Sequence, residues 1–425
     1  MANTLKFGNG QWASKEGSVL AYNDENNNFK PLPFDFTRAS GATRVNKEGL
    51  IEVVGGNEPR IDFSNDANGA LLLEPQRSNF VIYSEEFSQG YWEKATSDST
   101  PIPLVTANYA ISPDGTQNAD RVQLTLPTDN QFAVVRRSWI NPNTPVGSTI
   151  YQSIYLKATD ISQIGKKVDV YIFDTTNSSY RRIFNHVLTN NWERIESDNL
   201  ISFGSTSTSV EYVFGKARAN ASGQSSTTGT TQSEAASDFL VWGAQLEEGS
   251  YATSYIPTSG AAVTRVADVC NNGGNNQVIN STEGVLYFEG SVLDISTTNS
   301  WISVSEDANI NNNQINLRFV ADSNLIQAVS RANGLGQDVV LQYTLSDKTT
   351  INKIAIKYKL NDWALWVNGI EVDTKTSSVA FTSNSLDVLD FDRGNNSNYF
   401  YGNVKDIKLY NTALTDQELI ALTTI

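Results

Sequence analysis

The sequence predicts an all-β protein with two jelly-roll (β-sandwich) domains in tandem, preceded by an irregular N-terminal segment. Apolar and polar residues alternate in many short segments, and turns rich in Asn, Gly and Asp separate them. The 425 residues exceed one ordinary sandwich, and a hydrophobic content of 39% suffices for packed cores. We expect an attachment or wrapping segment at 1–78, a first sandwich at 79–258, a linker at 259–282 and a second sandwich at 283–425.

The N-terminal segment, 1–78, is interrupted by the turn signals FGNG, DENNN, KPLP, NKEG, VVGG and DANG. Its apolar runs are too short to bury much core alone. Two interpretations follow: the segment wraps around the following domain, or it docks onto another protein and orders only there. Planar guanidinium groups suit buried or interfacial ion pairs with Asp and Glu. We therefore expect an architectural role for the arginines in apolar surroundings, namely Arg38, Arg44, Arg60 and Arg77.

The first sandwich is predicted from alternating segments at 151–158, 168–174 and 210–217. Turn signals separate them, and several short strands at this spacing are typical of a two-sheet sandwich. Residues 219–237, rich in Ser, Thr and Gly, predict an exposed flexible loop. Small and polar residues dominate 259–282, which we interpret as an interdomain connector.

The second sandwich opens with a predicted strand at 283–292. Residues 352–372 predict three strands joined by two tight turns, the second at Asn368-Gly369. Asn-Gly readily adopts the two positive-φ conformations of a type I′ hairpin. The C-terminal sequence TDQELIALTTI has the Thr/Glu spacing of a capping box and predicts one short helical turn.

Charge and hydropathy exclude several classes of function. The net charge is −15, and no cluster of Lys and Arg is available to replace the counterions of a nucleic acid. No run of about 18 apolar residues occurs, so no membrane span is expected. The start MANTLKFGNG lacks a basic region followed by an apolar run, which predicts a protein made in the cytoplasm without a signal peptide.

The chain has one cysteine, Cys270, and one histidine, His186. An intramolecular disulfide and a Cys/His zinc cluster within one chain are therefore excluded. Any Ser-His-Asp mechanism would have to use His186, which the alternation of RRIFNHVLT places on a sheet surface. We expect no enzymatic activity.

Three segments resemble a region common in phage tail and other virion proteins: FTRASGATRV, NEPRIDF and LLLEPQRSNFVIYSEEFSQGYW. The same proteins typically close this domain with a sequence similar to FLVWGAQLEEGSYATSYIPT, and the two ends bracket residues 36–265. The resemblance implies a structural protein of a bacteriophage virion, contacting other virion proteins through its N-terminal segment. It also implies a homo-oligomer, with a trimer favoured, and fits either the tail or the head.

The intervening sandwich resembles the carbohydrate-binding modules attached to xylanases and cellulases, on Phe87, Trp92, Trp242 and the strands YQSIYLK and NNWERI. The C-terminal part resembles laminin-G/concanavalin-like jelly rolls, on YFYGNVKDIKLYNTALTDQELIAL and LWVNGIEV. Both resemblances imply a β-sandwich. They also imply a host surface glycan as a partner.

Modules of the first class often hold a structural calcium, partly through an acidic pair in the closing strand. Here that place has Val-Trp-Gly, although Glu86 and Asp238 can still offer oxygen ligands. The resemblance thus implies a structural calcium with an incomplete ligand set. The DFDRGNN run has oxygen ligands at alternate positions but lacks the Gly and Glu spacing of an EF-hand, so we expect a polar turn there.

Sugar sites use exposed Trp or Tyr rings that stack on the apolar faces of pyranoses, with polar side chains beside them. Trp139 and Trp301 follow polar stretches, and Trp363 follows the LND turn, so these three are the candidate carbohydrate-binding residues. The alternative for each is core packing. Structural roles are expected for the tryptophans inside apolar strand patterns, namely Trp192, Trp242 and Trp366.

Three functions remain open. In the first, the chain is a fibre, appendage or decoration subunit of a phage particle, and many copies make weak glycan binding firm. In the second, both sandwiches make only protein contacts within the virion. In the third, the chain cleaves glycans with two facing carboxylates, a pair that 46 acidic residues do not allow the sequence to nominate.

Overall fold

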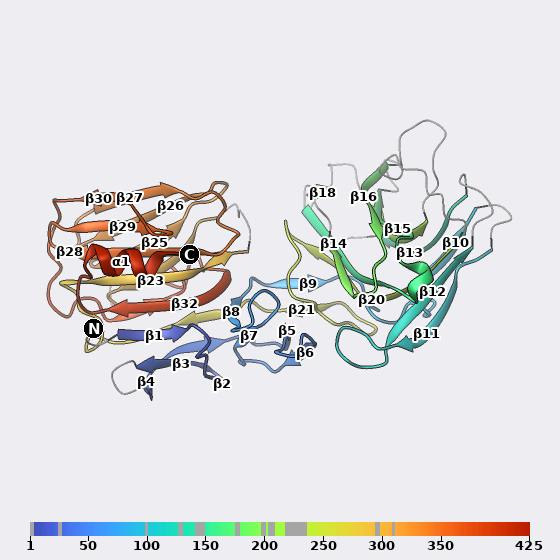
Figure 1. Cartoon of the computed structure of the whole chain (residues 1–425), viewed down its shortest axis with the longest axis horizontal. Helices are drawn as coiled ribbons and strands as arrows, with labels where there is room; N and C mark the ends of the chain where they lie inside the picture. Colours follow the sequence, from blue (N-terminus) through green and yellow to red (C-terminus); the bar gives the residue numbers. More distant parts are fainter. Residues whose placement is uncertain are drawn as a thin grey trace. The chain divides into compact units, whose positions relative to one another are not determined.

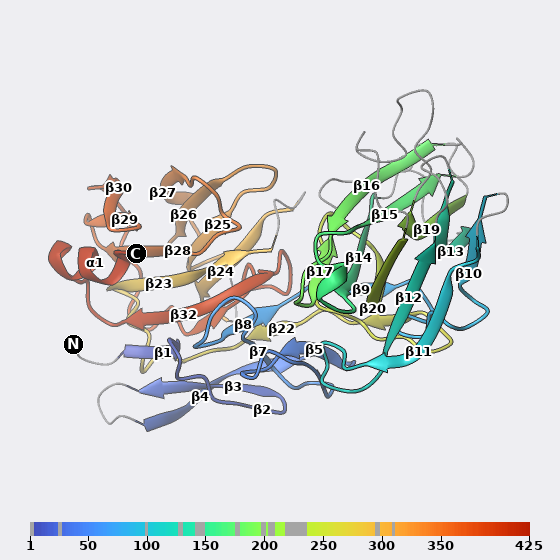
Figure 2. The same cartoon turned by 45° about the vertical axis from the view of Figure 1, so that its right-hand side comes forward.

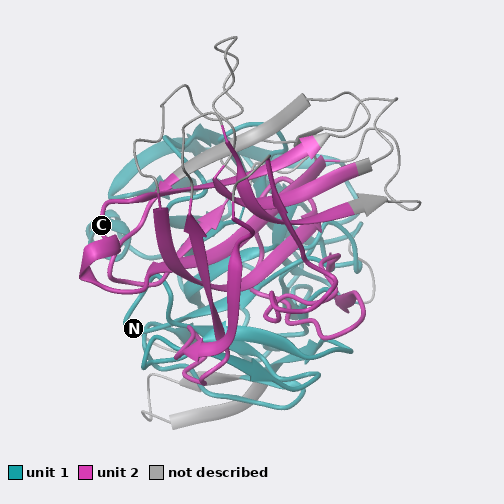
Figure 3. Cartoon of the chain, turned by 90° about the vertical axis from the view of Figure 1, so that its right-hand side faces the viewer, with its two compact units in different colours: residues 1–76, 266–425 teal, residues 77–265 magenta. Residues whose placement is uncertain are grey.

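The structure is a computed structural model, and it divides the chain into two compact units (Figures 1 and 3). Unit 1 combines Met1–Gln76 with Val266–Ile425, and unit 2 is Arg77–Arg265. Nearly all regular structure is β-strand, so the prediction of an all-β protein with sandwich domains is confirmed. The described residues are 4–23, 28–97, 101–125, 131–140, 149–174, 179–196, 201–202, 209–216, 236–293, 298–307 and 311–425.

Unit 2 is a sandwich of two antiparallel sheets with small additions. The five-stranded sheet has the order β10 (Glu93–Thr96), β13 (Ala133–Ile140), β19 (Ser209–Lys216), β15 (Lys167–Asp174), β16 (Ser179–Val187). The six-stranded sheet has the order β11 (Leu104–Ala110), β12 (Ala119–Thr125), β20 (Ala236–Glu248), β14 (Thr149–Ala158), β17 (Glu193–Glu196), with β18 (Ile201–Ser202) also on β14. A small sheet pairs β9 (Arg77–Asn79) with β21 (Val263–Arg265), and a 3-10 turn, η1, spans Ile161–Gln163.

Alternation explains the strands of unit 2. In β14, Ile150, Ile154, Leu156 and Ala158 point into the core, and the half-buried Tyr155 and Lys157 alternate with the last three. The core closes around Trp92, whose ring contacts that of Phe87 at 5.1 Å. The strands predicted at 151–158, 168–174 and 210–217 are therefore confirmed as β14, β15 and β19; most of the predicted loop at 219–237 lies outside the described residues.

Unit 1 has two large sheets and a small one. The twelve-stranded sheet has the order β22 (Val269–Asn271), β4 (Asn28–Thr37), β3 (Ser18–Asn23), β1 (Thr4–Gly8), β32 (Gly402–Tyr410), β23 (Glu283–Val292), β28 (Asn352–Lys359), β29 (Trp363–Val367), β30 (Ile370–Lys375). Its side members are β2 (Ser14–Lys15), β7 (Arg60–Asp62) and β8 (Ala70–Leu73). The five-stranded sheet has the order β27 (Gln337–Thr344), β26 (Leu325–Arg331), β25 (Gln314–Phe319), β24 (Ser300–Ser305), β31 (Val388–Asp390), and β5 (Ala42–Val45) pairs with β6 (Ile51–Val54).

The N-terminal segment belongs to unit 1, which corrects the expected domain division. Strand β1 pairs with β32 from Thr4↔Tyr410 to Gly8↔Asp406, and Figure 2 shows β1, β3 and β4 beside β32. Because the short apolar runs of this segment cannot form a core alone, they bury their side chains against strands near the C-terminus. The expected linker 259–282 is likewise divided, since β21 pairs within unit 2 and β22 pairs with β4.

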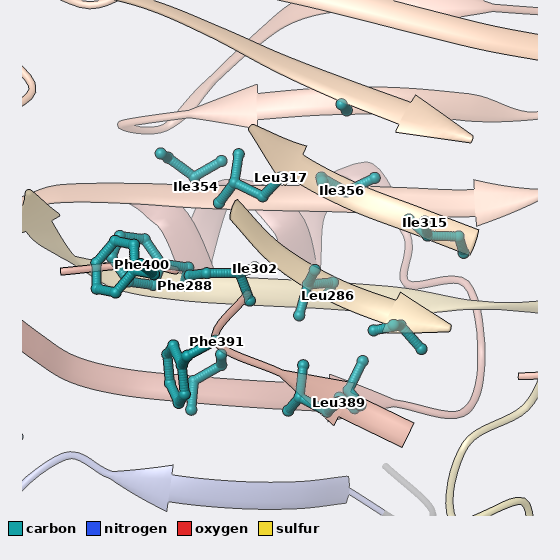
Figure 4. Packing of buried hydrophobic residues seen from close by; sticks show 14 of the residues in the cluster. Leu286, Phe288, Ile302, Ile315, Leu317, Ile354, Ile356, Leu389, Phe391 and Phe400 are labelled. Carbon is teal, nitrogen blue, oxygen red and sulfur yellow. The ribbon is translucent and has the colours of Figure 1, made fainter. Parts of the chain in front are cut away.

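The core of unit 1 lies between its two large sheets. Figure 4 shows Leu286 and Ile354 from the twelve-stranded sheet packing near Ile302, Ile315 and Leu317 from the five-stranded sheet. Burial of these side chains is the main source of stability. It also forces the intervening residues of each strand onto the opposite face of the sheet.

A second, smaller core covers the other face of the twelve-stranded sheet. The helix α1, Asp416–Thr423, buries Leu419 there against Trp366 and Tyr287. The predicted capping box is confirmed, because Thr415 accepts from the N–H of Glu418 and Glu418 accepts from the N–H of Thr415. The predicted Asn-Gly hairpin joins β29 and β30 with positive φ at both turn residues.

Two of the four N-terminal arginines are buried in an ion-pair cluster within unit 1. Arg38 Nη1 lies 3.0 Å from Asp268 Oδ1, and Arg60 pairs with both Asp268 and Glu74. Arg44 pairs with Glu52 at 2.7 Å near the surface. These contacts fit the predicted architectural role. No helix in the described ranges is long and apolar enough to cross a membrane.

Candidate functional site

The five-stranded sheet of unit 1 has one apolar and one polar face. In β24, Ile302 and Val304 lie in the core, so Trp301 and Ser303 face away from it. The same alternation in β25 turns the residues opposite them to the outer side. The antiparallel register pairs Trp301 with Arg318 and Ser303 with Asn316 across the two strands, and Arg318 with Gln327 of β26.

Polar atoms on this outer face are buried without hydrogen-bond partners in the described part of the chain. Buried polar groups nearly always pair with protein, water or a ligand, so such a concentration on one sheet face requires an explanation. We call the residues that contribute these atoms the polar face. The seven atoms are Trp301 Nε1, Ser303 Oγ, Ser305 Oγ, Asn316 Oδ1, Arg318 Nε, Gln327 Oε1 and Arg393 Nε.

Trp301 is the centre of the polar face. Its side chain is 7% exposed, and two guanidinium groups lie over its ring. The Cζ atom of Arg318 lies 5.3 Å from the ring centroid, and that of Arg393 lies 5.4 Å from it. Both distances are within the range of cation–π attraction. The amide of Gln314 donates to the carbonyl of Arg393, which fixes the loop after β31 to this face.

The two arginines are half-buried and carry like charges. Among the described residues, neither guanidinium forms an ion pair or donates a hydrogen bond to a carboxylate. Burial and, secondarily, the positive charge of Arg393 lower the pKa of Arg318. The polar face therefore has positive charge that no carboxylate of the described chain compensates.

Buried carboxylates lie at the edge of the same sheet. Asp390 of β31 pairs in register with Ser303, and its Oδ1 accepts from the N–H of Asn272 at 2.7 Å. Burial raises the pKa of Asp390 to about 7, and the charge of Asp392 adds to this effect. Asp392 accepts from the N–H of Gly394 and from the Asn271 amide, as expected for a polar turn.

The structure places the three predicted tryptophans apart, in three different sheets. Trp363 is only 2% exposed and packs in the main core with Tyr358 and Phe381, so it cannot stack on a sugar; that prediction is wrong. Trp301 lies at the polar face, but arginines rather than an open ring surface face outward, which corrects the expected stacking. Trp139 lies in β13 opposite Val210, and its side chain lies outside the described residues.

The other tryptophans follow their expected structural roles. Trp242 and Trp366 are buried, and Trp192 is half-buried, with its Nε1 donating to the carbonyl of Ile111 at 3.1 Å. Residues that sequence reasoning missed are Arg318, Arg393 and Asn316. The alternation of QINLRF contained the signal for two of them, since every second residue in that strand is polar.

The two predicted calcium ligands are engaged elsewhere within unit 2. Asp238 forms an ion pair with Arg121 and accepts from the Thr159 hydroxyl at 2.6 Å. Glu86 accepts from Gln89 at 2.9 Å and from Ser259 at 3.1 Å. Across the described ranges, no group of three or more His, Cys, Asp or Glu side chains is placed to hold a metal ion. These residues do not fit the implied calcium.

His186 lies in β16, as the alternation predicted. Its Nε2 lies 3.4 Å from the carboxylate of Glu193. Burial lowers the pKa of His186, and the attraction of Glu193 only partly opposes this effect. Burial therefore favours the neutral form of this half-buried histidine.

Residues 271–420 match the family described as the Concanavalin A-like lectin/glucanases superfamily (Laminin_G_3). The matched range contains the five-stranded sheet with the whole polar face, and strands β23, β28, β29, β30 and β32 of the twelve-stranded sheet. Unit 1 thus carries a concanavalin-like lectin fold, and the predicted laminin-G/concanavalin-like resemblance is confirmed for this part. No curated protein matches the chain.

Several solved structures show partial similarity to the chain. One is the CBM40 module of the Ruminococcus gnavus IT-sialidase, with 16% identity, a TM-score of 0.29, and coverage of 34% of this chain and 84% of that one. Another is domain 4 of the Geobacillus stearothermophilus arabinanase AbnA in complex with arabinotriose, with 15% identity, a TM-score of 0.30, and coverage of 40% and 81%. A third is the enzymatically active domain of tailspike protein 4 of bacteriophage CBA120, with 11% identity, a TM-score of 0.28, and coverage of 40% and 21%. Similarities this distant carry no argument about ligand or activity.

Proposed function

We propose that the protein is a non-enzymatic, glycan-binding structural subunit of a bacteriophage particle. The observation that carries the glycan-binding part is the polar face of the concanavalin-like fold. Nε1 of Trp301 and six further buried polar atoms of this face have no partners in the described chain. Saccharides present many hydroxyl groups in fixed directions, and such a face offers donors and acceptors at fixed positions to meet them. The match to a lectin superfamily supports the same proposal.

The virion part of the proposal rests on the motifs FTRASGATRV and FLVWGAQLEEGSYATSYIPT, which resemble segments of phage structural proteins. In this proposal, the chain assembles as a homo-oligomer, with a trimer favoured, and presents several copies of the polar face to the host surface. Weak affinity at each face then becomes firm attachment through multivalency.

Binding of the full-length protein to a host-surface glycan array tests the glycan part. Asn316→Leu replaces the central amide of the polar face with an apolar side chain of similar size. We expect it to weaken glycan binding by about ten-fold or more, because ligand groups would lose a buried hydrogen-bond partner. Glu371→Ala, on an exposed position of β30, is the matched control and should bind as the wild type does. Equal binding by wild type and Asn316→Leu would contradict a site at this face.

The second candidate function is a purely structural role, in which the chain makes protein contacts and binds no glycan. Strand β11 is the edge of the six-stranded sheet, and apolar side chains on and beside it are exposed to solvent. Exposed apolar groups on a sheet edge suit contact with another protein chain. They are Ile102, Leu104, Tyr109 and Ile111.

The oligomeric mass separates these two roles. We expect the wild type to be an oligomer by light scattering. If the β11 edge makes the subunit contact, Leu104→Lys should lower the mass toward that of a single 46.6 kDa chain. A folded oligomer that binds no glycan on the array would favour the purely structural role and reject the glycan-binding one.

A further inference from the structure

The charge of the polar face indicates the chemical class of the ligand. Like-charged guanidinium groups repel one another, and a protein rarely buries them together without an acidic partner. Arg318 and Arg393 lie within 5.4 Å of one tryptophan ring centroid, yet no carboxylate of the described residues pairs with either. The nearest acidic neighbour in sequence, Asp392, is engaged by Gly394 and the Asn271 amide instead.

By contrast, two other half-buried arginines on sheet faces of this chain are paired with carboxylates. Arg121 is paired with Asp238 across β12 and β20, and Arg136 is paired with Glu93 and Glu211 across its neighbouring strands. The chain has 46 acidic residues for 31 basic ones, so carboxylates are not scarce. Arg137 and Arg331 also have no carboxylate partner in the described ranges, so the distinguishing feature of this site is that two such arginines lie over one tryptophan ring.

We infer that the polar face binds an acidic saccharide, whose carboxylate is held by the guanidinium groups of Arg318 and Arg393 beside Trp301. The inference rests on the proposed function, since it names the ligand class of the same face. Guanidinium groups form paired, charge-assisted hydrogen bonds with a planar carboxylate. Trp301 is a positioning residue, because its ring holds both arginines in place. The side-chain oxygens of Asn316 and Gln327 have no partner among the described residues, and that of the half-buried Gln327 can accept from a hydroxyl group of the sugar.

The overall charge of the chain makes this inference sharply testable. With a net charge of −15, the protein as a whole repels anions, so nonspecific attraction cannot produce a preference for acidic glycans. The experiment compares binding of the full-length protein to matched glycan pairs on one array. Each pair consists of a carboxylate-bearing saccharide and its carboxyl-reduced, neutral counterpart.

We expect the wild type to bind the acidic member of at least one pair about 10- to 100-fold more tightly than the neutral one. Arg318→Gln and Arg393→Gln should each abolish most of this preference. Arg44→Gln removes the same charge at a surface ion pair of the same unit and should leave the preference unchanged. Far-UV circular dichroism and thermal unfolding of each variant establish that it is folded.

The possible outcomes separate the inference from the proposed function. Binding of acidic glycans that both arginine variants lose supports the inference. Equal or tighter binding of the neutral members overturns the inference but leaves glycan binding in place. If the folded wild type binds no glycan of either kind, both proposals fail. Retention of the acidic preference by both arginine variants also overturns the inference, because the carboxylate would then be held elsewhere.

Discussion

Unit 1 contains two pairs of arginines whose surroundings differ in one decisive way. Arg38 and Arg60 are fully buried and share the carboxylate of Asp268. Arg318 and Arg393 are half-buried, share a tryptophan ring, and have no carboxylate partner among the described residues. The guanidinium charges of the first pair are thus neutralised by buried carboxylates, whereas those of the second pair are not neutralised by any carboxylate of the described residues.

The charges of Arg38 and Arg60 are neutralised by buried carboxylates. Burial alone would lower the pKa of Arg60, but the charges of Asp268 and Glu74 outweigh it and raise that pKa above its ordinary value. For Arg318 the balance has the opposite sign, since burial and Arg393 both lower its pKa. Arg38 and Arg60 thus stabilise the folded chain, whereas Arg318 and Arg393 are held in place by the rest of the structure.

The largest effect is expected from removing the shared carboxylate. Asp268→Asn leaves two buried guanidinium groups without their counter-charge and places amide hydrogens where Arg60 and the N–H of Glu74 donate. We expect a loss of about 3–5 kcal/mol in the free energy of unfolding. Urea denaturation measures it. A loss below about 1 kcal/mol would show that the cluster is not the architectural element described above.

The carboxylate of Asp390 is also buried and, like the guanidinium group of Arg318, has a pKa shifted toward its neutral form. The pKa of Asp390 in the folded chain is about 7, above its ordinary value of 3.8. Because the folded state binds this proton more tightly than the unfolded state, stability from this group is fully present at low pH. It is lost as the pH rises through about 7.

Asp390→Asn should therefore stabilise the protein at pH 8. An amide cannot ionise, and its oxygen can still accept from the N–H of Asn272. We expect the difference in unfolding free energy between variant and wild type to grow by about 1–3 kcal/mol between pH 5 and pH 8. Urea denaturation at both pH values measures this change. A difference that is independent of pH would contradict the raised pKa.

The sequence predicted the local elements of the fold but not the way that distant strands combine. Alternation identified β14, β15, β19 and β23, because each strand has one face toward a core. The pairing of β1 with β32 joins residues about 400 positions apart, and no local pattern specifies a partner at that separation. The sequence consequently predicts that the N-terminal segment wraps around the following domain or docks onto another protein, and not that it pairs with strands near the C-terminus.

The candidate site was predicted in part, for a similar reason. Trp301 stood out as a tryptophan after a polar stretch, but its two arginines come from the neighbouring strand and from a loop after β31. The prediction that Trp363 binds sugar failed because β29 is buried on both faces, by the main core on one side and by α1 on the other. Only the layered structure reveals which tryptophans remain near solvent.

Removing Arg318, which has no carboxylate partner among the described residues, should have little effect on the free energy of unfolding. Arg318→Gln loses a cation–π contact with Trp301 but relieves repulsion from Arg393 and the cost of burying an uncompensated charge. We expect the free energy of unfolding to stay within about 1 kcal/mol of the wild type. Urea denaturation of the variant beside Asp268→Asn provides the comparison. A destabilisation similar to that of Asp268→Asn would mean that Arg318 has a structural role rather than a binding role.

The smallest effect is expected at the surface pair of Arg44 and Glu52, whose side chains are 22% and 37% exposed. Solvent screens this pair, and ordering two long side chains opposes their attraction, so a coupling energy of about 0.2–1 kcal/mol is expected. A double-mutant cycle of Arg44→Gln and Glu52→Gln measures it directly. Because Arg44 is paired like Arg60 but exposed unlike it, this cycle separates the effect of pairing from that of burial. A coupling as large as that of the Asp268 cluster would mean that pairing alone, without burial, determines which arginines hold the fold together.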